Sequence, residues 1–327
     1  MTAQAFERLA EPLRREIKVH CYRMLGSVQQ AEDLVQESYL RAWRSFAQFE
    51  GGSIRAWLYK IATNACLNAL ESRKRMQRWL PDQIGPSTTK LPDDSPPADV
   101  AWLEPCPDSC LEGIVDDRPT PEARYAAREA VQLAFVAAIQ QLPPRQRAVL
   151  LLCDVLGLAA TETATLLDGT TAAINSALQR ARETLAKRYP EGRPLIAQRP
   201  DAEQQLLLDR YLIAWEQHDV DGFVALLKED ATFTMPPWLQ WYMGRAAIKS
   251  FFAVAWQTCG GVRLVPIAAN GQPAFAVYDH SSADGQWHAH AIHVLTIRDR
   301  LIVAVTAFQP PAGPKLFPAF GLPHLLR

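Results

Sequence analysis

Residues 168–188, DGTTAAINSALQRARETLAKR, predict a helix with two different faces. Ile174, Leu178, Ala181 and Leu185 recur at spacings of four, three and four, so they form one stripe that needs a core to pack against. The other faces carry side chains able to hydrogen-bond base edges or neutralise phosphates. A solvated surface helix can have the same composition, so the preceding sequence must decide between the two interpretations. The polar set is Asn175, Ser176, Gln179, Arg180, Arg182, Lys187 and Arg188.

The preceding segments predict a helix-turn-helix. A helix is expected from the Thr120 cap and Pro121 onward, followed by an apolar helix that ends at Gly157. A short helix then ends where Gly169 turns the chain. A short helix, a tight turn and a longer helix with a polar face match the DNA-binding motif that inserts its second helix into the major groove. We therefore expect an all-α DNA-binding domain over residues 121–190.

The N-terminal segment predicts a second all-α domain, residues 5–80. Three helices are expected: the first ends at Gly26, the second begins at the Ser27 cap, and the third begins at Ser53. The second and third helices each have one apolar stripe, which predicts a common core. The third ends in a basic cluster consisting of Arg73, Lys74, Arg75 and Arg78.

An acidic, proline-rich linker is expected at residues 81–120, between the two helical domains. The formal net charge of -1 conceals an asymmetry along the chain. Basic residues exceed acidic ones by 13 to 8 in residues 1–80 and by 8 to 5 in 131–200, whereas 81–130 has 11 acidic and 4 basic residues. This layout fits two nucleic-acid-binding modules joined by an acidic segment, although unevenly charged domains also occur without that role. The apolar island VAWLEP within the linker could pack on a neighbouring domain.

The last part of the chain, residues 201–327, changes character and predicts an α+β domain. Helices are expected at 203–228 and 245–260, separated by DATFTMPP. Extended runs with β-branched residues follow and indicate a curved antiparallel sheet. These runs are VRLVPIAAN, QPAFAVYDH and WHAHAIHVLTIRDRLIVAVTAF.

The two helical segments resemble a bacterial sigma-70 family RNA polymerase subunit of the extracytoplasmic-function (ECF) group. The resemblance rests on residues 31–75, AEDLVQESYLRAWRSFAQFEGGSIRAWLYKIATNACLNALESRKR, and on 142–188, LPPRQRAVLLLCDVLGLAATETATLLDGTTAAINSALQRARETLAKR. It implies a transcription initiation factor whose partners are core RNA polymerase and promoter DNA, with sigma region 2 in 5–80 and sigma region 4 in 121–190. A repressor that binds duplex DNA alone would have the helix-turn-helix without the 31–75 block, so we disfavour it.

The resemblance also implies three binding surfaces. In the family, region 2 packs on a coiled coil of the largest polymerase subunit and reads the minus-ten promoter element as a single strand, which requires cations and a pocket for an extruded base. Region 4 reads the minus-thirty-five element in the major groove, where Arg180 could contact guanine. Trp43 could instead fill its own domain's core, and Asn64 could simply be solvated. The expected contacts are Asp33, Glu37, Arg41 and Trp43 for polymerase, Arg55, Lys60, Asn64, Arg73, Lys74 and Arg75 for minus-ten, and Asn175, Ser176, Gln179 and Arg180 for minus-thirty-five.

Residues 201–327 resemble the SnoaL-like branch of the nuclear-transport-factor-like cone fold, mainly through WEQHDVDGFVALLKEDATFTMPP. The fold expected for the chain is therefore multidomain, with two all-α domains followed by an α+β cone-shaped SnoaL-like domain. The linker WLEPCPD and the terminal FPAFGLP resemble one subgroup of sigma factors that have such an extension.

The function expected for the SnoaL-like domain is regulation of the sigma regions, not catalysis. The alternative is a DNA-binding fusion whose C-terminal domain is a small-molecule acid-base enzyme, since His and Asp side chains in a pocket can transfer protons. Simple core packing of the aromatic residues is a third interpretation. No cofactor is expected, and no metal, because the histidine pair lacks an identifiable third ligand. The candidate pocket for a small-molecule ligand consists of Trp238, Trp241, Tyr242, His288 and His290.

Composition gives an expectation for the compartment. The start of the chain has no apolar signal-peptide core, and no apolar run reaches the roughly 20 residues that span a bilayer. We therefore expect a cytoplasmic protein with no membrane partner. Of six cysteines, Cys106 and Cys110 are the two that lie close together in the sequence, and a metal site there would need two more ligands.

Overall fold

The computed structural model describes residues 3–49, 51–72, 77–92, 95–110, 130–188, 201–280 and 284–326. It contains two compact units. The helical unit consists of Met1–Arg78 and Leu103–Arg193, and the C-terminal unit consists of Trp79–Trp102 and Pro194–Arg327. The chain changes unit at three points, and one of them, between Trp102 and Leu103, falls within the segment expected to be a linker. No helix among the described residues is long and apolar enough to cross a membrane.

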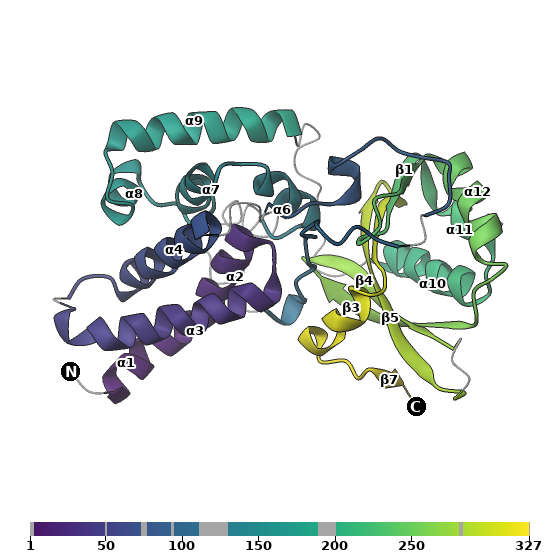
Figure 1. Ribbon diagram of the computed structural model, residues 1–327, viewed down its shortest axis with the longest axis horizontal. Helices are drawn as coiled ribbons and strands as arrows, with labels where there is room; N and C mark the ends of the chain where they lie inside the picture. Colours follow the sequence, from purple (N-terminus) through teal and green to yellow (C-terminus); the bar gives the residue numbers. More distant parts are fainter. Residues whose placement is uncertain are drawn as a thin grey trace. The chain divides into compact units, whose positions relative to one another are not determined.

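The first part of the helical unit contains four α-helices (Figure 1). Ser27 caps the third, since its hydroxyl accepts a hydrogen bond from the Gln30 amide, and Gly26 ends the second at a φ of 68°, both as predicted. The prediction of a single first helix is wrong. The chain forms a 3₁₀ turn at Pro12, whose ring nitrogen cannot donate a helical hydrogen bond, and this turn separates α1 from α2. The elements are α1 Ala3–Ala10, η1 Glu11–Leu13, α2 Arg14–Leu25, α3 Val28–Ser45, η2 Phe46–Gln48 and α4 Ile54–Ser72.

The second part of the helical unit contains the predicted helix-turn-helix, formed by α8 and α9. Ile174, Leu178 and Ala181 are buried and Leu185 is half-buried, which confirms the predicted stripe. The Thr120 cap and Pro121 lie outside the described residues. The elements are α6 Leu133–Gln140, α7 Pro144–Leu150, which continues as the π-helical turn η5 Leu151–Val155, α8 Ala160–Leu166 and α9 Thr171–Arg188.

Helices from these two parts pack together within the helical unit. Helix α4 contacts α7 and α8, and α2 contacts α6 and α7 (Figure 1). The stretch that precedes this second part also belongs to the unit, since α2 contacts the short turn η4, Asp108–Cys110.

The C-terminal unit is a sheet with helices gathered on one side (Figure 1). The strand order is β2-β1-β6-β5-β4-β3, and β7 pairs with β5. Register shifts in the β1–β6, β4–β5 and β5–β6 pairs mark bulges, which bend a sheet. The elements are α10 Ala202–Glu216, α11 Val220–Ala225, β1 Leu227–Thr234, β2 Trp241–Met243, α12 Arg245–Ala255, β3 Val262–Ala269, β4 Gln272–Asp279, β5 Trp287–Arg298, β6 Leu301–Phe308, η6 Gly313–Phe320 and β7 Leu325–Leu326.

Three details of this unit differ from the prediction. The single helix expected over 203–228 is broken into α10 and α11, because His218 adopts a φ of 52° after α10 and Asp219 then caps α11. The run 287–308 is a hairpin that turns at Asp299 and Arg300, both with positive φ. Strand β1 pairs with β6 in parallel, so the sheet is mixed. The helices and the sheet enclose a core rich in aromatic side chains, including Tyr211, Trp215, Phe223, Phe233, Phe252 and Trp256.

Candidate nucleic-acid interface

Helix α9 presents the predicted DNA-contact residues to solvent. Asn175, Ser176, Gln179 and Arg180 are all exposed on the face opposite the buried stripe. The polar face of α9 is therefore open for contact with base edges, which is the arrangement of a recognition helix.

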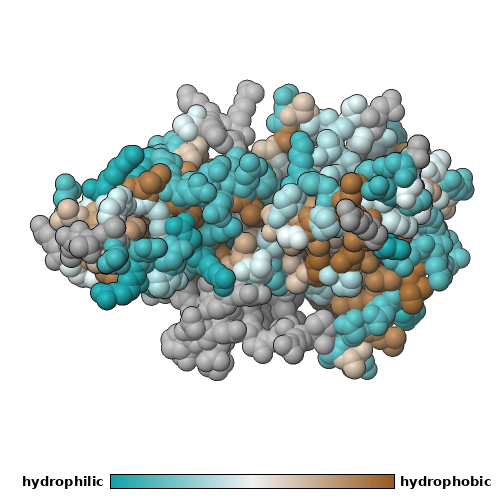
Figure 2. Space-filling view, turned by 90° about the horizontal axis from the view of Figure 1, so that it is seen from below, coloured by the Kyte–Doolittle hydropathy of each residue, from teal (hydrophilic) through white to brown (hydrophobic). Residues whose placement is uncertain are grey.

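Arg182, on a neighbouring face of α9, is held by the unit itself. Its Nε and Nη2 donate to the Asp154 carboxylate at 2.9 and 2.6 Å. This ion pair joins α9 to η5, the helical turn that precedes the helix-turn-helix. Figure 2 shows mostly hydrophilic residues over the helical unit, whereas hydrophobic residues gather on part of the C-terminal unit.

The residues predicted to contact polymerase lie along α3. Asp33 and Arg41 are exposed, and Arg41 forms an ion pair with Glu37 one turn away. Trp43 packs its ring edge-to-face on Phe6, with ring centroids 5.6 Å apart, yet it stays 41% exposed. Trp43 therefore does not simply fill the core. It lines a groove of about 490 Å³ whose other lining residues are Phe6, Glu7, Ala10, Glu11, Arg14, Gln36, Tyr39 and Leu40.

The predicted minus-ten residues of α4 are partly engaged within the protein. Arg55 Nε donates to the Glu16 carboxylate at 2.9 Å, and this hydrogen bond raises the pKa of Arg55. Lys60 Nζ donates to Asp168 Oδ1 at 2.8 Å. Asn64 is half-buried. The other predicted members, Arg73, Lys74 and Arg75, lie outside the described residues.

The Lys60–Asp168 ion pair joins the two parts of the helical unit at the surface, and a buried arginine joins them in the interior. Arg147 of α7 is 2% exposed and donates to the Met24 carbonyl, to Gln140 Oε1 at 2.7 Å and to the Leu142 carbonyl at 3.2 Å. Burial lowers the pKa of Arg147 to about 10, so the group remains a cation at neutral pH. A buried cation bound to carbonyls from both parts holds them together. No local feature of the sequence signals this role, because Arg147 stands in an ordinary amphipathic helix.

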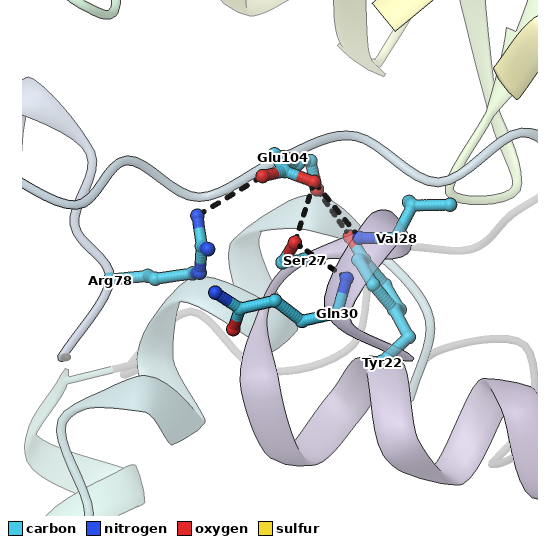
Figure 3. Close-up of polar contacts among 6 residues, drawn as sticks. All are labelled: Tyr22, Ser27, Val28, Gln30, Arg78 and Glu104. Carbon is cyan, nitrogen blue, oxygen red and sulfur yellow. Dashed lines mark hydrogen bonds and ion pairs between the residues drawn. The ribbon is translucent and has the colours of Figure 1, made fainter. Parts of the chain in front are cut away.

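Glu104, from the predicted linker, forms a clasp on the first part of the unit (Figure 3). Its Oε2 accepts hydrogen bonds from Ser27 Oγ at 2.9 Å and from the Val28 amide at 3.0 Å. Its Oε1 lies 3.2 Å from Arg78 Nη1. A carboxylate at these positions satisfies an amide at the N-terminus of α3 and complements the helix dipole. The sequence showed only that the VAWLEP island could pack on a neighbouring domain.

Gly26 is the point where α2, the linker and α6 converge. A Cβ at this position would lie 2.8 Å from Leu103 Cδ1, 3.1 Å from Arg78 Cδ and 3.2 Å from Gln140 Cδ. Glycine thus provides both the positive φ that ends α2 and the room for this close approach. The sequence signalled the first property and not the second.

The aromatic residues of the candidate ligand pocket hold the first half of the linker. Trp241 Nε1 donates to the Gly85 carbonyl at 2.8 Å, and the Tyr242 hydroxyl donates to the Lys90 carbonyl at 2.8 Å. Tyr242 is fully buried and stacks on Phe251 at 4.4 Å, while Trp238 is half-buried. Trp241 and Tyr242 therefore bind residues 85–90 within the C-terminal unit.

The histidines of the same candidate pocket lie elsewhere in the sheet. His288 Nε2 is 2.8 Å from the Asp284 carboxylate, and His290 Nδ1 is 3.7 Å from Asp279 Oδ2. Strands β1 and β6 separate β2 from β5, which amounts to about 14 Å at the usual strand spacing. The structure thus does not bring the aromatic and histidine members of the predicted pocket into contact.

A third histidine, His293, lies in the aromatic core of the C-terminal unit. Its Nδ1 is 3.0 Å from the Tyr211 hydroxyl, and its ring centroid is 4.5 Å from that of Trp215. Burial lowers the pKa of His293 to about 3, so the imidazole is neutral at physiological pH. Among the described residues, no group of three or more His, Cys, Asp or Glu side chains is arranged to hold a metal ion.

A two-part helical unit with an exposed recognition helix, joined to an α+β unit, defines a transcription factor of the sigma type. Family models for Sigma-70 region 2, Sigma-70 region 4 and a SnoaL-like domain match residues 9–76, 132–185 and 208–305. The ECF RNA polymerase sigma factor SigG of Mycobacterium tuberculosis is 44% identical over 329 residues, which cover 98% of this chain and 85% of that protein. The chain belongs to the ECF RNA polymerase sigma factors, which direct promoter-specific transcription initiation, and it has a SnoaL-like C-terminal domain.

A second relative has the same architecture. The ECF RNA polymerase sigma factor SigJ of Mycobacterium tuberculosis is 29% identical over 229 residues, or 68% of this chain and 62% of that protein. The crystal structure of Mycobacterium tuberculosis SigJ covers 96% of this chain and 98% of its own, with a TM-score of 0.60 at 24% identity. The predicted family and fold class are therefore confirmed.

Proposed function

We propose that this sigma factor holds its two promoter-binding regions closed in the free protein and that its C-terminal unit regulates their release. The observation that carries the proposal is the buried Arg147, which bonds carbonyls from both sigma regions within one compact unit. Core RNA polymerase and promoter DNA are the partners whose binding separates the two regions.

The distance between the promoter elements supports a closed resting state. The minus-ten and minus-thirty-five elements are separated by about 25 base pairs, or about 85 Å of duplex at 3.4 Å per step. In the helical unit, Lys60 on the proposed minus-ten surface forms an ion pair with Asp168, just before the recognition helix. A unit with these surfaces in contact cannot bind both elements, so initiation requires regions 2 and 4 to separate.

Three surfaces then act in the open state. We propose that Asp33, Arg41 and Trp43, with Glu37, contact polymerase through the α3 face and its groove. Arg55, Lys60 and Asn64 line the single strand at minus-ten, where Arg55 exchanges Glu16 for phosphate. The contacts proposed for the minus-thirty-five major groove are Asn175, Ser176, Gln179 and Arg180.

The linker gives the C-terminal unit a means of regulation. Its residues 85–90 are bonded to Trp241 and Tyr242 of the C-terminal unit, and Glu104 is bonded to region 2. A change in the C-terminal unit that pulls on this covalent connection would weaken the clasp. We propose no catalytic role for the unit, because the neutral His293 is sealed in an aromatic core.

Run-off transcription with core polymerase, on promoters selected from a random library, tests the proposal. The full chain, a chain ending at residue 199 and the Glu104→Ala variant are compared. We expect the full chain to be active and both changes to alter its activity, with Glu104→Ala raising it because the linker that leads from region 2 to region 4 is released from region 2. Inactivity of all three on every promoter would contradict the sigma assignment. Unchanged activity after both changes would contradict the regulatory role.

A further inference from the structure

Two cysteines lie directly after the Glu104 clasp, in a tight turn. The Cys110 amide donates to the Pro107 carbonyl at 3.0 Å, which folds the chain back over the 3₁₀ turn Asp108–Cys110 and brings Cys110 close to Cys106. Cys106 is 2% exposed, whereas Cys110 is only partly buried. The pair thus has one member that solvent reaches and one that it does not.

A lysine from α2 lies beside this pair. Lys18 Nζ is 2.5 Å from the Glu32 carboxylate, and α2, the helix that contains Lys18, contacts the turn that contains Cys110. The hydrogen bond from Cys106, followed by the charge of Lys18, lowers the pKa of Cys110 to about 7 although burial opposes the shift. The hydrogen bond to Cys110, together with burial, raises the pKa of Cys106. An accessible thiolate next to a protonated thiol is the arrangement of a peroxide-reactive cysteine with its resolving partner.

The other cysteines, all of which the structure describes, lack this combination. Cys21 and Cys66 are both fully buried, and a hydrogen bond from Cys21 together with burial raises the pKa of Cys66. Burial raises the pKa of Cys153 and of Cys259, so both are protonated at neutral pH. Cys259 is exposed, so it would be oxidised first if exposure alone decided reactivity. It is therefore the control for the reactivity of Cys110.

We propose that Cys106 and Cys110 are a redox-active dithiol that hydrogen peroxide converts into an intramolecular disulfide. The Cys110 sulfur attacks a peroxide oxygen, the O–O bond breaks, and the leaving oxygen takes a proton to give water and a sulfenic acid on Cys110. The Cys106 sulfur then attacks the Cys110 sulfur, so that the S–S bond forms, the S–O bond breaks and a second water leaves. The two thiols lose two electrons and the peroxide gains them. This site stands independently of the proposed closed state.

The test treats the reduced full-length protein with hydrogen peroxide, alkylates the remaining thiols and maps tryptic peptides by mass spectrometry. Cys106 and Cys110 fall on one peptide, beginning at Leu91, that contains no other cysteine. We expect this peptide to lose the mass of two hydrogen atoms before Cys259 reacts, and dithiothreitol to restore both thiols.

Three variants sharpen the test. Cys106→Ser should stop the reaction at a Cys110 sulfenic acid that dimedone traps, and Lys18→Met should slow oxidation about tenfold because the thiolate fraction at neutral pH falls. Cys259→Ser should leave the rate unchanged. Circular dichroism verifies that each variant is folded, and the wild-type measurement does not depend on them. Oxidation of Cys259 ahead of the pair, or full alkylation of Cys106 and Cys110 after peroxide, would overturn the proposal.

Discussion

Glu104 places a carboxylate where the first amide of α3, the Ser27 hydroxyl and the Arg78 guanidinium converge. Glu104→Ala leaves those donors without this acceptor, at a position where the Arg78 side chain is only 9% exposed. We expect the helical unit to lose about 1–3 kcal/mol of unfolding free energy, measured by urea denaturation.

Glu11→Ala is the matched control for this prediction. Glu11 forms an exposed ion pair with Arg14 three residues away, and such pairs contribute less than about 1 kcal/mol. Equal effects of the two substitutions would show that Glu104 is only another surface charge.

The buried His293 makes the stability of the C-terminal unit depend on pH. Its pKa is about 3 in the folded protein, whereas an exposed histidine in the unfolded chain has a pKa near 6.5. Between those values the unfolded chain binds a proton that the folded chain does not. Stability is therefore complete above about pH 6.5 and is lost as the pH falls, by up to about 1.4 kcal/mol per unit from this group.

Urea denaturation at about pH 7.5 and pH 5.5 measures this loss. Tryptophan fluorescence reports on the transition, since the Trp215 ring lies 4.5 Å from that of His293. In His293→Gln the loss on acidification should be smaller by about 1 kcal/mol, while His20, with its pKa also lowered to about 3 by burial, keeps its own contribution in the helical unit. An unchanged pH dependence in the variant would contradict the prediction.

At the scale of elements, the proposed function assigns the promoter specificity of region 4 to α9. Arg180→Ala removes an exposed guanidinium able to make a bidentate contact with guanine. We expect binding of the holoenzyme to a cognate minus-thirty-five element to weaken by about 1–3 kcal/mol, and specificity at one base pair to relax, in competition binding assays.

Lys187→Ala is the control for Arg180→Ala, because it removes an exposed positive charge from the last turn of the same helix. Its loss should weaken binding to all sequences alike. If Arg180→Ala weakened binding to every DNA sequence equally, Arg180 would not read a base and the role proposed for α9 would be contradicted.

The elements also show what the sequence could and could not predict. The α9 stripe and the Ser27 cap were predictable because periodicity and capping are local signals. The parallel β1–β6 pair was not, because strand partners depend on contacts distant in the sequence. Arg147 was missed for the same reason: its donor groups resemble those of any surface arginine until the fold places Met24 beside them. The contacts of Trp241 and Tyr242 with residues 85–90 were not predicted, because from the sequence these aromatic residues were assigned to a ligand pocket or to core packing.

At the scale of the whole molecule, one compact unit holds both sigma regions through contacts of different strength. The Lys60–Asp168 ion pair is largely exposed and contributes little. Of the contacts between the two regions, the buried Arg147 is the one whose loss would be costly, whereas the Glu104 clasp ties the linker to region 2. In the proposed closed state, polymerase binding must offset that cost, and this would lower the affinity of the free protein for its partners.

The most direct test of this closed state is the distance between regions 2 and 4 in the free protein and in a transcribing complex. Dyes are attached through non-canonical amino acids at Asn68 of α4 and Ala172 of α9, both of which are exposed. The efficiency of resonance energy transfer between the two dyes should be high in the free full-length protein. It should fall to near zero when core polymerase and promoter DNA are added, because the minus-ten and minus-thirty-five elements hold the regions about 85 Å apart. Low transfer in the free protein, or high transfer that persists in the active complex, would contradict the closed resting state.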